Sequence, residues 1–136
     1  SFGAFAAIRR DGSVVTWGHG DFGGDSEAVK GELENVKSIQ ASHTAFAAIR
    51  TDGSVVAWGD DVCGGNSSGV KDELHGVLCI QASHSAFAAI RDDGFVVTWG
   101  GRASGGNSAA VQDHLHDVQQ IQSSHTAFAG IRSDGS

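Results

Sequence analysis

The sequence has few basic residues and no long apolar segment. Of its 136 residues, nine are Lys or Arg and sixteen are Asp or Glu, so the formal net charge is −7 at pH 7. Clustered Lys and Arg mark a nucleic-acid-binding surface, and no such cluster occurs here. No apolar run approaches the ~20 residues that span a bilayer. We therefore expect neither a nucleic-acid partner nor direct insertion into a membrane.

The chain contains a block of 41 residues that occurs three times, in units 1–41, 42–82 and 83–123, and begins again in the partial unit 124–136. Each complete unit carries Ala-Phe-Ala-Ala-Ile-Arg, an Asp-Gly pair, Val-Val-x-Trp-Gly and a Gly-Gly pair. A fixed period of roughly 40–50 residues is typical of propellers, solenoids and arrays, whose units bury apolar faces against their neighbours. We therefore expect residues 1–136 to form a single repeat domain, which indicates a binding scaffold rather than an enzyme.

Each unit contains three segments of strand length. The second unit has an apolar run at 45–50 and a β-branched run at 54–59, and the runs at 36–42 and 77–83 are copies of each other. Between the first two, Asp52-Gly53 supplies the positive φ that a tight hairpin needs. Each unit thus predicts a small antiparallel sheet.

The segment 45–50 is apolar on both faces. Alternation places Ala45, Ala47 and Ile49 on one face and Phe46 and Ala48 on the other. Strands that are buried on both sides have this pattern. We therefore expect a neighbouring sheet to pack against each face.

A helical turn is expected after the Gly-rich loop of each unit. Val70, Leu74 and Val77 follow the spacing i, i+4 and i+7, which favours one or two helical turns at the sheet edge. An irregular fourth strand is the alternative. The predicted fold class is all-β, with blades of a β-propeller that form part of a larger or open array; a stacked solenoid also meets the two-sided burial.

The repeated elements resemble the RCC1-type repeat (regulator of chromosome condensation). The elements that carry the resemblance are His-Thr or His-Ser, Asp-Gly, Val-Val and Trp-Gly, then Gly-Gly, and they stand at His43-Thr44, Asp52-Gly53, Val55-Val56, Trp58-Gly59 and Gly64-Gly65. The same elements recur with the same spacing in the third unit. The resemblance covers essentially the whole chain. A WD40 blade fits less well, because Gly rather than Asp follows the tryptophan. The units are also shorter than is usual for the RCC1 family and contain no proline.

The resemblance implies an RCC1-like propeller that serves as a protein-interaction scaffold without catalytic activity. Two alternatives are a fixed peripheral subunit of a large complex, and the regulatory propeller of a HERC-like ubiquitin ligase or a guanine-nucleotide exchange factor. The wording also resembles repeats of large proteins of photosynthetic protists, which implies an organellar or photosynthetic complex as one setting. We favour an intracellular location, cytosolic or organellar.

Three sets of residues recur at the 41-residue period and are interpreted as structural. They comprise His43, His84 and His125, then Trp17, Trp58 and Trp99, and the hairpin glycines Gly12, Gly53 and Gly94. The three histidines match the structural histidine of the family, which we expect to bond a neighbouring strand or loop. A shared metal ion is disfavoured, because equivalent positions of a propeller lie far apart unless they line the axis.

No catalytic, cofactor-binding or metal-binding residue is predicted. The segment 18–23 satisfies G-x-G-x-x-G, but its copies at 59–64 and 100–105 do not, and no βαβ unit follows. His114 and His116 point apart on a helical turn and are expected to be solvated. Cys63 and Cys79 recur in no other unit, so two free thiols are favoured over a bridge.

The segments 19–22, 60–63 and 101–104 differ between units while the scaffold around them stays constant. Repeat proteins build binding faces in this way. Neutral drift in unconstrained loops is the alternative. The candidate partner-binding residues are His19, Asp21, Phe22, Asp60, Asp61, Val62, Arg102 and Ser104.

The first thirteen and the last thirteen residues supply the same strand, so a clean ring closure is not expected. The chain is interpreted as a window from a longer array. Its two end faces are apolar, with Phe5 and Phe128 close to the termini. Because repeat arrays need polar caps at such ends, we expect the isolated chain to self-associate or to be poorly soluble.

Overall fold

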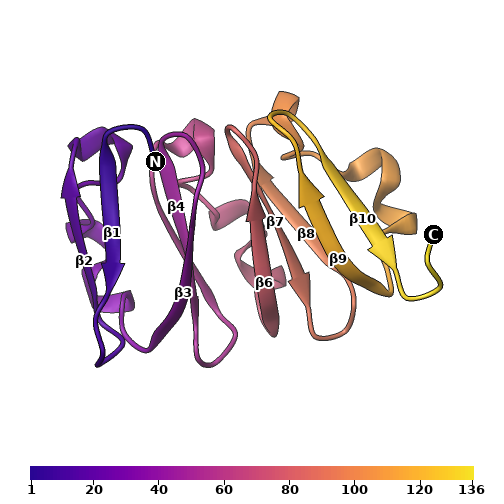
Figure 1. Ribbon diagram of the computed structural model, residues 1–136, viewed down its shortest axis with the longest axis horizontal. Helices are drawn as coiled ribbons and strands as arrows, with labels where there is room; N and C mark the ends of the chain where they lie inside the picture. The colour runs from indigo at the N-terminus through magenta and orange to yellow at the C-terminus, as the bar shows by residue number, and fades with distance from the viewer.

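The computed structural model describes all of residues 1–136. It contains ten strands and six 3₁₀ helices (Figure 1). The strands are β1 (Ala4–Ile8), β2 (Val14–Gly18), β3 (Val36–Ala41), β4 (Ala45–Arg50), β5 (Val55–Gly59), β6 (Val77–Ala82), β7 (Ala86–Arg91), β8 (Val96–Gly100), β9 (Val118–Ser123) and β10 (Phe128–Arg132). The 3₁₀ helices are η1 (Gly20–Phe22), η2 (Glu27–Glu32), η3 (Asp61–Cys63), η4 (Ser68–Glu73), η5 (Arg102–Ser104) and η6 (Ala109–His114).

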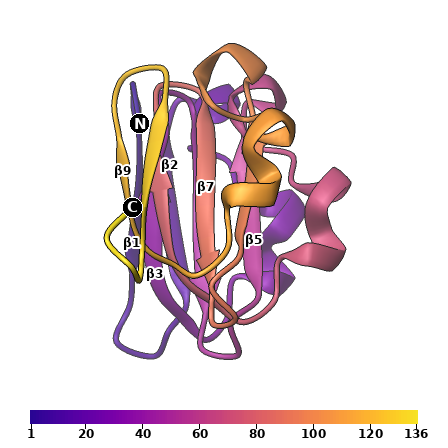
Figure 2. The same ribbon diagram turned by 90° about the vertical axis from the view of Figure 1, so that its right-hand side faces the viewer.

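The strands form two complete antiparallel blades and two partial ones. Strands β3-β4-β5 and β6-β7-β8 make three-stranded sheets, whereas β1-β2 and β9-β10 are two-stranded. The sheets stand side by side along the molecule, with the N-terminus near one end of the row and the C-terminus at the other (Figure 1). The 3₁₀ helices lie on one side of this row, next to β5 and away from β9 (Figure 2). All four sheets are small and antiparallel, so the all-β prediction is confirmed.

The middle strand of each complete blade is buried on both faces. Ala45, Ala47 and Ile49 belong to the apolar core between the two complete blades. Phe46 and Ala48 belong to a separate core shared with the first unit. The predicted alternation of 45–50 is confirmed, so each blade contributes to two cores instead of enclosing one of its own. A blade therefore depends on its neighbours for burial.

The predicted helical turns are present as the six-residue 3₁₀ helices η2, η4 and η6, and the alternative of a fourth strand is wrong. Leu33 and Leu74 directly follow η2 and η4 and are buried in the cores. 3₁₀ turns are frequent as connectors between other elements, which is the place that these helices occupy between one blade and the next. None of the helices has the length and hydrophobicity needed to cross a membrane.

The Asp-Gly hairpins are stabilised by a serine two residues after the aspartate. Asp52 accepts hydrogen bonds from the backbone N–H and the hydroxyl of Ser54, at 3.0 and 2.6 Å. Both bonds lower the pKa of Asp52 below its ordinary value, and the bond from the Ser54 hydroxyl has the larger effect. The glycine that follows, Gly53, has φ +81° and accepts a bond from the N–H of Val77, which ties the hairpin to the next blade.

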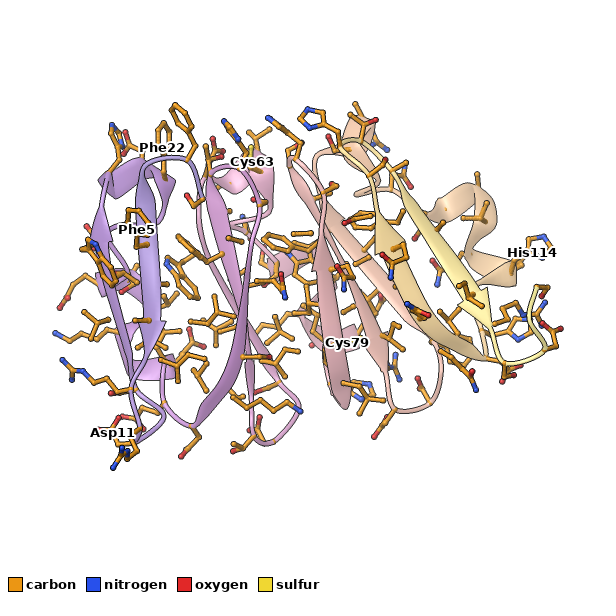
Figure 3. All side chains as sticks on the ribbon, viewed as in Figure 1. Phe5, Asp11, Phe22, Cys63, Cys79 and His114 are labelled. Carbon is orange, nitrogen blue, oxygen red and sulfur yellow. The ribbon has the colours of Figure 1, made fainter.

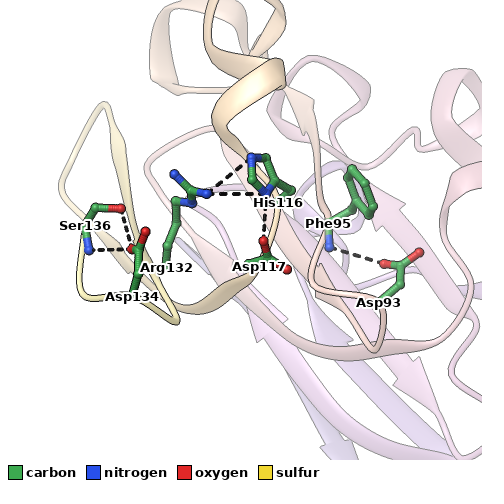
Figure 4. Close-up of polar contacts among 7 residues, drawn as sticks. All are labelled: Asp93, Phe95, His116, Asp117, Arg132, Asp134 and Ser136. Carbon is green, nitrogen blue, oxygen red and sulfur yellow. Dashed lines mark hydrogen bonds and ion pairs between the residues drawn. The ribbon is translucent and has the colours of Figure 1, made fainter.

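The third unit departs from this arrangement because Phe95 replaces the serine. Asp93 accepts only the backbone N–H of Phe95, at 3.2 Å, and forms an ion pair with Arg91 instead. In the partial fourth unit Ser136 restores both bonds to Asp134, and Figure 4 places the two turns side by side for comparison. An Arg–Asp ion pair is thus found in the third unit, where the serine is missing.

Candidate functional site

Trp58 and Trp99 each join their own blade to the preceding unit. The indole Nε1 of Trp58 donates to the carbonyl of Gly23 at 3.1 Å, and that of Trp99 donates to Gly64 at the same distance. Phe87 stacks on Trp99 with ring centroids 5.3 Å apart. Gly64 has φ +99°, and a Cβ there would lie 2.5 Å from the Phe87 ring, so a side chain cannot be accommodated. The structure places Trp58 and Trp99 in the packing between blades.

The recurrent histidines form a ladder across neighbouring units. The backbone N–H of His43 donates to the carbonyl of His84, and that of His84 to His125, both at 2.8 Å. The aromatic rings lie in the same order as the backbone bonds. The ring centroids of His43 and His84 are 4.4 Å apart and stacked, and those of His84 and His125 are 4.5 Å apart and tilted. Phe2 stacks on His43 with a centroid distance of 5.0 Å. The three side chains lie close together, because the short turn before each middle strand lies directly against the same turn of the next unit.

The middle histidine of the ladder is disfavoured as a cation. Burial lowers the pKa of His84 below 6.5, and the charges that His43 and His125 would carry lower it further. A neutral imidazole stacks without repulsion, whereas a second positive charge at such a distance is costly. The lowered pKa therefore favours the neutral form of His84 in the folded chain.

The variable segments lie together at one end of the blades. Each folds as a 3₁₀ helix, namely η1, η3 and η5, and Phe22 and Cys63 mark that end in Figure 3, whereas the hairpin residue Asp11 lies at the opposite end. The turns end in glycines with positive φ at Gly23, Gly64 and Gly105. Because these glycines also contact the next blade, the constant scaffold sets the position of each variable turn.

Five of the eight candidate partner-binding residues are freely exposed. Asp21, Asp61 and Arg102 present charged groups, His19 stacks on Phe22 at 4.3 Å, and Val62 is 74% exposed. Val62 is the most exposed of the large apolar side chains of the chain.

The other three candidates hold the turns in place. Asp60 caps η3 by accepting the N–H of Val62 at 2.8 Å. Ser104 is buried, and its hydroxyl bonds that of Ser85 at 2.7 Å. Phe22 is half-buried between His19 and Phe2. Asp60 and Ser104 thus support the surface from beneath.

A groove lies between η1 and η3, and a second groove lies between η3 and η5. The first groove, of about 400 Å³, is lined by Asp21 and Asp61 with Asp25 and the edge of Trp58, and is acidic. The second, of about 420 Å³, is lined by Asp61, Val62 and Arg102 and carries both signs of charge. The same scaffold therefore presents two grooves of different electrostatic character, and the difference comes from the variable residues.

Sequence reasoning missed several residues at the end of the blades where the variable turns lie. Asn66, Ser68 and Gly69 line the second groove beside Val62. Phe2 extends the histidine ladder, and its position one period before His43 was the signal that could have revealed it. No three His, Cys, Asp or Glu side chains are grouped so as to hold a metal ion.

The remaining sequence candidates lie elsewhere. His114 is exposed, and His116 is half-buried against the guanidinium of Arg132 and bonds Asp117 at 2.8 Å (Figure 4). Cys63 and Cys79 are free, as favoured above, and burial raises the pKa of the Cys79 thiol.

Comparisons with known proteins give matches in structure. No protein-family model and no curated protein matches the sequence. The fold is similar to that of yeast RCC1 (Prp20) in its complex with Kap60, with a TM-score of 0.70 and 17% identity over 99% of this chain and 40% of that one. It is also similar to Prp20p from Saccharomyces cerevisiae, studied for its binding to Gsp1p and histones, with a TM-score of 0.68 and 15% identity over 99% and 41%.

Human WBSCR16 is a third similar structure, with a TM-score of 0.51 and 15% identity over 94% of this chain and 37% of that one. The chain thus spans about two fifths of the length of these solved structures. At these identities the likeness concerns the fold, which is RCC1-like.

Proposed function

We propose that this chain is a non-catalytic protein-binding scaffold whose partner docks on the end formed by η1, η3 and η5. The observation that carries the proposal is the separation of constant and variable residues. The glycines and tryptophans that fix the turns are the same in each complete unit, whereas the residues that line the grooves differ. Loops that vary on a rigid scaffold are the usual way for repeat proteins to build a binding face.

The chemistry of the second groove suits a protein partner. Val62 offers an apolar contact, with Asp61 and Arg102 as charged groups of opposite sign beside it. An apolar centre with a polar rim is the arrangement found in protein interfaces. The solved structures with this fold include yeast RCC1 bound to Kap60, which supports a role in binding proteins. The partner's groove-facing residues would present an apolar side chain flanked by acidic and basic groups.

The polar groups of the two grooves are carboxylates, one guanidinium, amide and hydroxyl groups and backbone atoms. Such a mixture can pair with the polar and charged side chains of a protein partner.

A photo-crosslinking residue placed at Val62 tests the proposal. Thr51 is the matched control, since it is also exposed but lies in a hairpin turn at the opposite end. Irradiation of each variant in extracts of the source organism should give one discrete crosslinked protein from position 62 and none from position 51. Equal products from both positions would contradict the proposal.

The same experiment separates the two modes of binding. Reversible loss of the crosslinked protein on washing indicates an exchangeable scaffold. Retention in a constant ratio to the chain indicates a fixed subunit of a larger complex.

A further inference from the structure

The outer strand of each complete blade has one edge that no other strand pairs with. Strands β5 and β8 stand last in the sheets β3-β4-β5 and β6-β7-β8, so each has a strand on one side only. The 3₁₀ helices lie on this outer side of the row, next to β5 (Figure 2). A strand edge presents main-chain N–H and C=O groups that can pair with the main chain of another protein. The outer edges are therefore candidates for such pairing.

The hydrogen bonds of the β7-β8 hairpin show which main-chain groups of β8 face outward. The N–H of Arg91 donates to the carbonyl of Phe95 next to the turn. Bonded and non-bonded pairs alternate along an antiparallel ladder, so the following pair, Ile90 and Val96, is not bonded. The N–H and C=O groups of Val96, and those of Thr98 two residues on, therefore point away from β7.

One of these outward groups is bonded by a side chain. The amide Nε2 of Gln112, in η6, donates to the carbonyl of Val96 at 3.2 Å. The main-chain N–H and C=O of Thr98 bond no loop or helix of the chain, although its hydroxyl bonds Gly106 and Ser108. A side-chain amide thus stands where the N–H of a fourth strand would stand, and the main-chain groups of Thr98 are left without a partner.

The outer edge of β8 forms the floor of a groove between η4 and η6, which we call the β8 groove. It has a volume of about 490 Å³ and is lined by Val70 and Glu73 from η4, by Val96 and Thr98 from β8, and by Gln112 from η6, among other residues. An extended peptide bound to a sheet edge needs free main-chain groups beside it and pockets for alternate side chains. The β8 groove offers both.

A groove of the same construction lies one period earlier, along β5. It has a volume of about 210 Å³ and is lined by Val29, Glu32, Val55 and Ala57, which stand 41 residues before lining residues of the β8 groove. The main-chain groups of Ala57 also bond no loop or helix, although Ala57 is only 9% exposed. The groove is thus a feature of the repeat itself.

The β8 groove differs from its copy by an exposed aromatic ring. Phe95 lines it and is 46% exposed, whereas serine stands at the counterpart position, Ser54. The phenylalanine deprives Asp93 of the hydroxyl bond that Asp52 receives from Ser54. Proteins tend to violate a local rule of stability at functional positions. The ring is therefore interpreted as a contact for an apolar side chain.

We propose that the β8 groove binds an extended segment of a partner protein, which adds to the outer edge of β8 as a fourth strand. The main chain of the segment pairs with the N–H and C=O of Thr98 and replaces Gln112 at the carbonyl of Val96. One of its apolar side chains packs on Phe95 and Val70. The β8 groove shares no lining residue with the two grooves between the variable turns. The proposal therefore holds whether or not those turns bind a protein.

A display library of random peptides of about ten residues supplies the probe, since paired strands are usually about five residues long. The library is selected on the intact 136-residue chain. We expect the enriched peptides to share a run of apolar and β-branched residues without proline, as an added strand requires. A selection that enriches no peptide overturns the proposal.

Substitution of Phe95 tests the side-chain contact. Phe95→Ser gives the β8 groove the residue that the second unit has at this position, so the fold of the hairpin is preserved. We expect the enriched peptides to bind roughly tenfold more weakly, because a central aromatic contact is lost. An unchanged Kd in isothermal titration overturns the proposed place of the peptide.

Two substitutions of Thr98 test the main-chain contact. Thr98→Pro removes the outward N–H and leaves the ladder to β7 intact, since proline is tolerated where an edge strand faces away from its neighbour. Thr98→Ala is the matched control, because it removes the same hydroxyl bonds and keeps the N–H. We expect the proline variant to bind roughly tenfold more weakly than the alanine variant. Equal affinities overturn strand addition.

Amide hydrogen exchange of the unmodified chain locates the peptide without any substitution. The N–H of Thr98 should exchange rapidly in the free chain and become protected when the peptide saturates it, whereas Val97, whose N–H faces β7, should be protected in both states. Protection confined to η1, η3 and η5 would overturn the outer site while supporting the docking end proposed above. Protection of Thr98 that rises with the concentration of the free chain would assign the edge to a second copy and also overturn the proposal.

Discussion

The first unit and the third unit contain nearly the same aromatic pair in opposite surroundings. Phe5 and Trp17 expose 59% and 50% of their surface, whereas Phe87 is fully buried and Trp99 is 5% exposed. Both pairs stack at similar centroid distances, 5.5 and 5.3 Å, and the strands that carry them pair in the same register. The difference teaches that a blade fixes the geometry of its aromatic pair, while only the preceding blade buries it.

Truncation of the phenylalanine to alanine should give the largest difference in stability between the first and the third unit. Phe87→Ala removes a fully buried ring from the core between the complete blades, so we expect a loss of roughly 3–5 kcal/mol in the free energy of unfolding. The matched change Phe5→Ala removes a mostly exposed ring and should cost less than about 1 kcal/mol. Denaturant unfolding of both variants, at concentrations where the chain is monomeric, measures the difference. Similar losses in the two variants would mean that the first unit is packed as tightly as the third.

A methyl group on the contact glycine should have the next largest effect. Gly64→Ala places a Cβ 2.5 Å from the Phe87 ring at φ +99°, and the backbone conformation alone costs about 1–2 kcal/mol. Gly31→Ala is the control, since a Cβ there meets nothing within 4 Å and Gly31 lies in a 3₁₀ helix. Its effect should stay below about 1 kcal/mol. Thermal unfolding of the two variants decides, and an equal shift in Tm would contradict tight packing at Gly64.

The indole hydrogen bond can be tested without emptying the core. Trp99→Phe leaves an aromatic ring but removes the donor to the Gly64 carbonyl, which should cost about 1–3 kcal/mol because a buried acceptor is left unpaired. Trp17→Phe should be close to neutral, since Trp17 donates to no carbonyl in the chain. The test is again the free energy of unfolding of the monomer. A larger loss from Trp17→Phe would show that the N-terminal end is covered in solution.

The sequence was sufficient for the period, the strands and the two-sided burial of 45–50. These follow from alternation and from the Asp-Gly turns, which act locally and are repeated in every unit. The histidine ladder could not be predicted, because the distance between His43 and His84 depends on how neighbouring blades stack. The grooves between the variable turns depend on the same stacking, as does the use of Asp60 and Ser104 as supports beneath the surface.

The smallest expected effect is on the pH dependence of stability, and it compares the middle of the histidine ladder with its N-terminal end. His84 lies between two imidazoles, whereas Phe2 already occupies the equivalent position at the N-terminal end and stacks there on His43. His84→Phe should therefore fit the ladder while removing its titration. The pKa of His84 is lowered in the folded chain, by burial first and then by its histidine neighbours.

The sign of the pH effect follows from that shift. Above the ordinary value of 6.5 the imidazole is neutral whether the chain is folded or unfolded, and its contribution to stability is fully present. As the pH falls through the folded pKa, the unfolded chain binds the proton more readily, so the free energy of unfolding decreases. Denaturant titrations at a series of pH values should show a shallower acid limb for His84→Phe than for the unmodified chain. Parallel limbs would place the proton-sensitive group elsewhere, whereas a difference would show that His84 resists protonation in the folded chain.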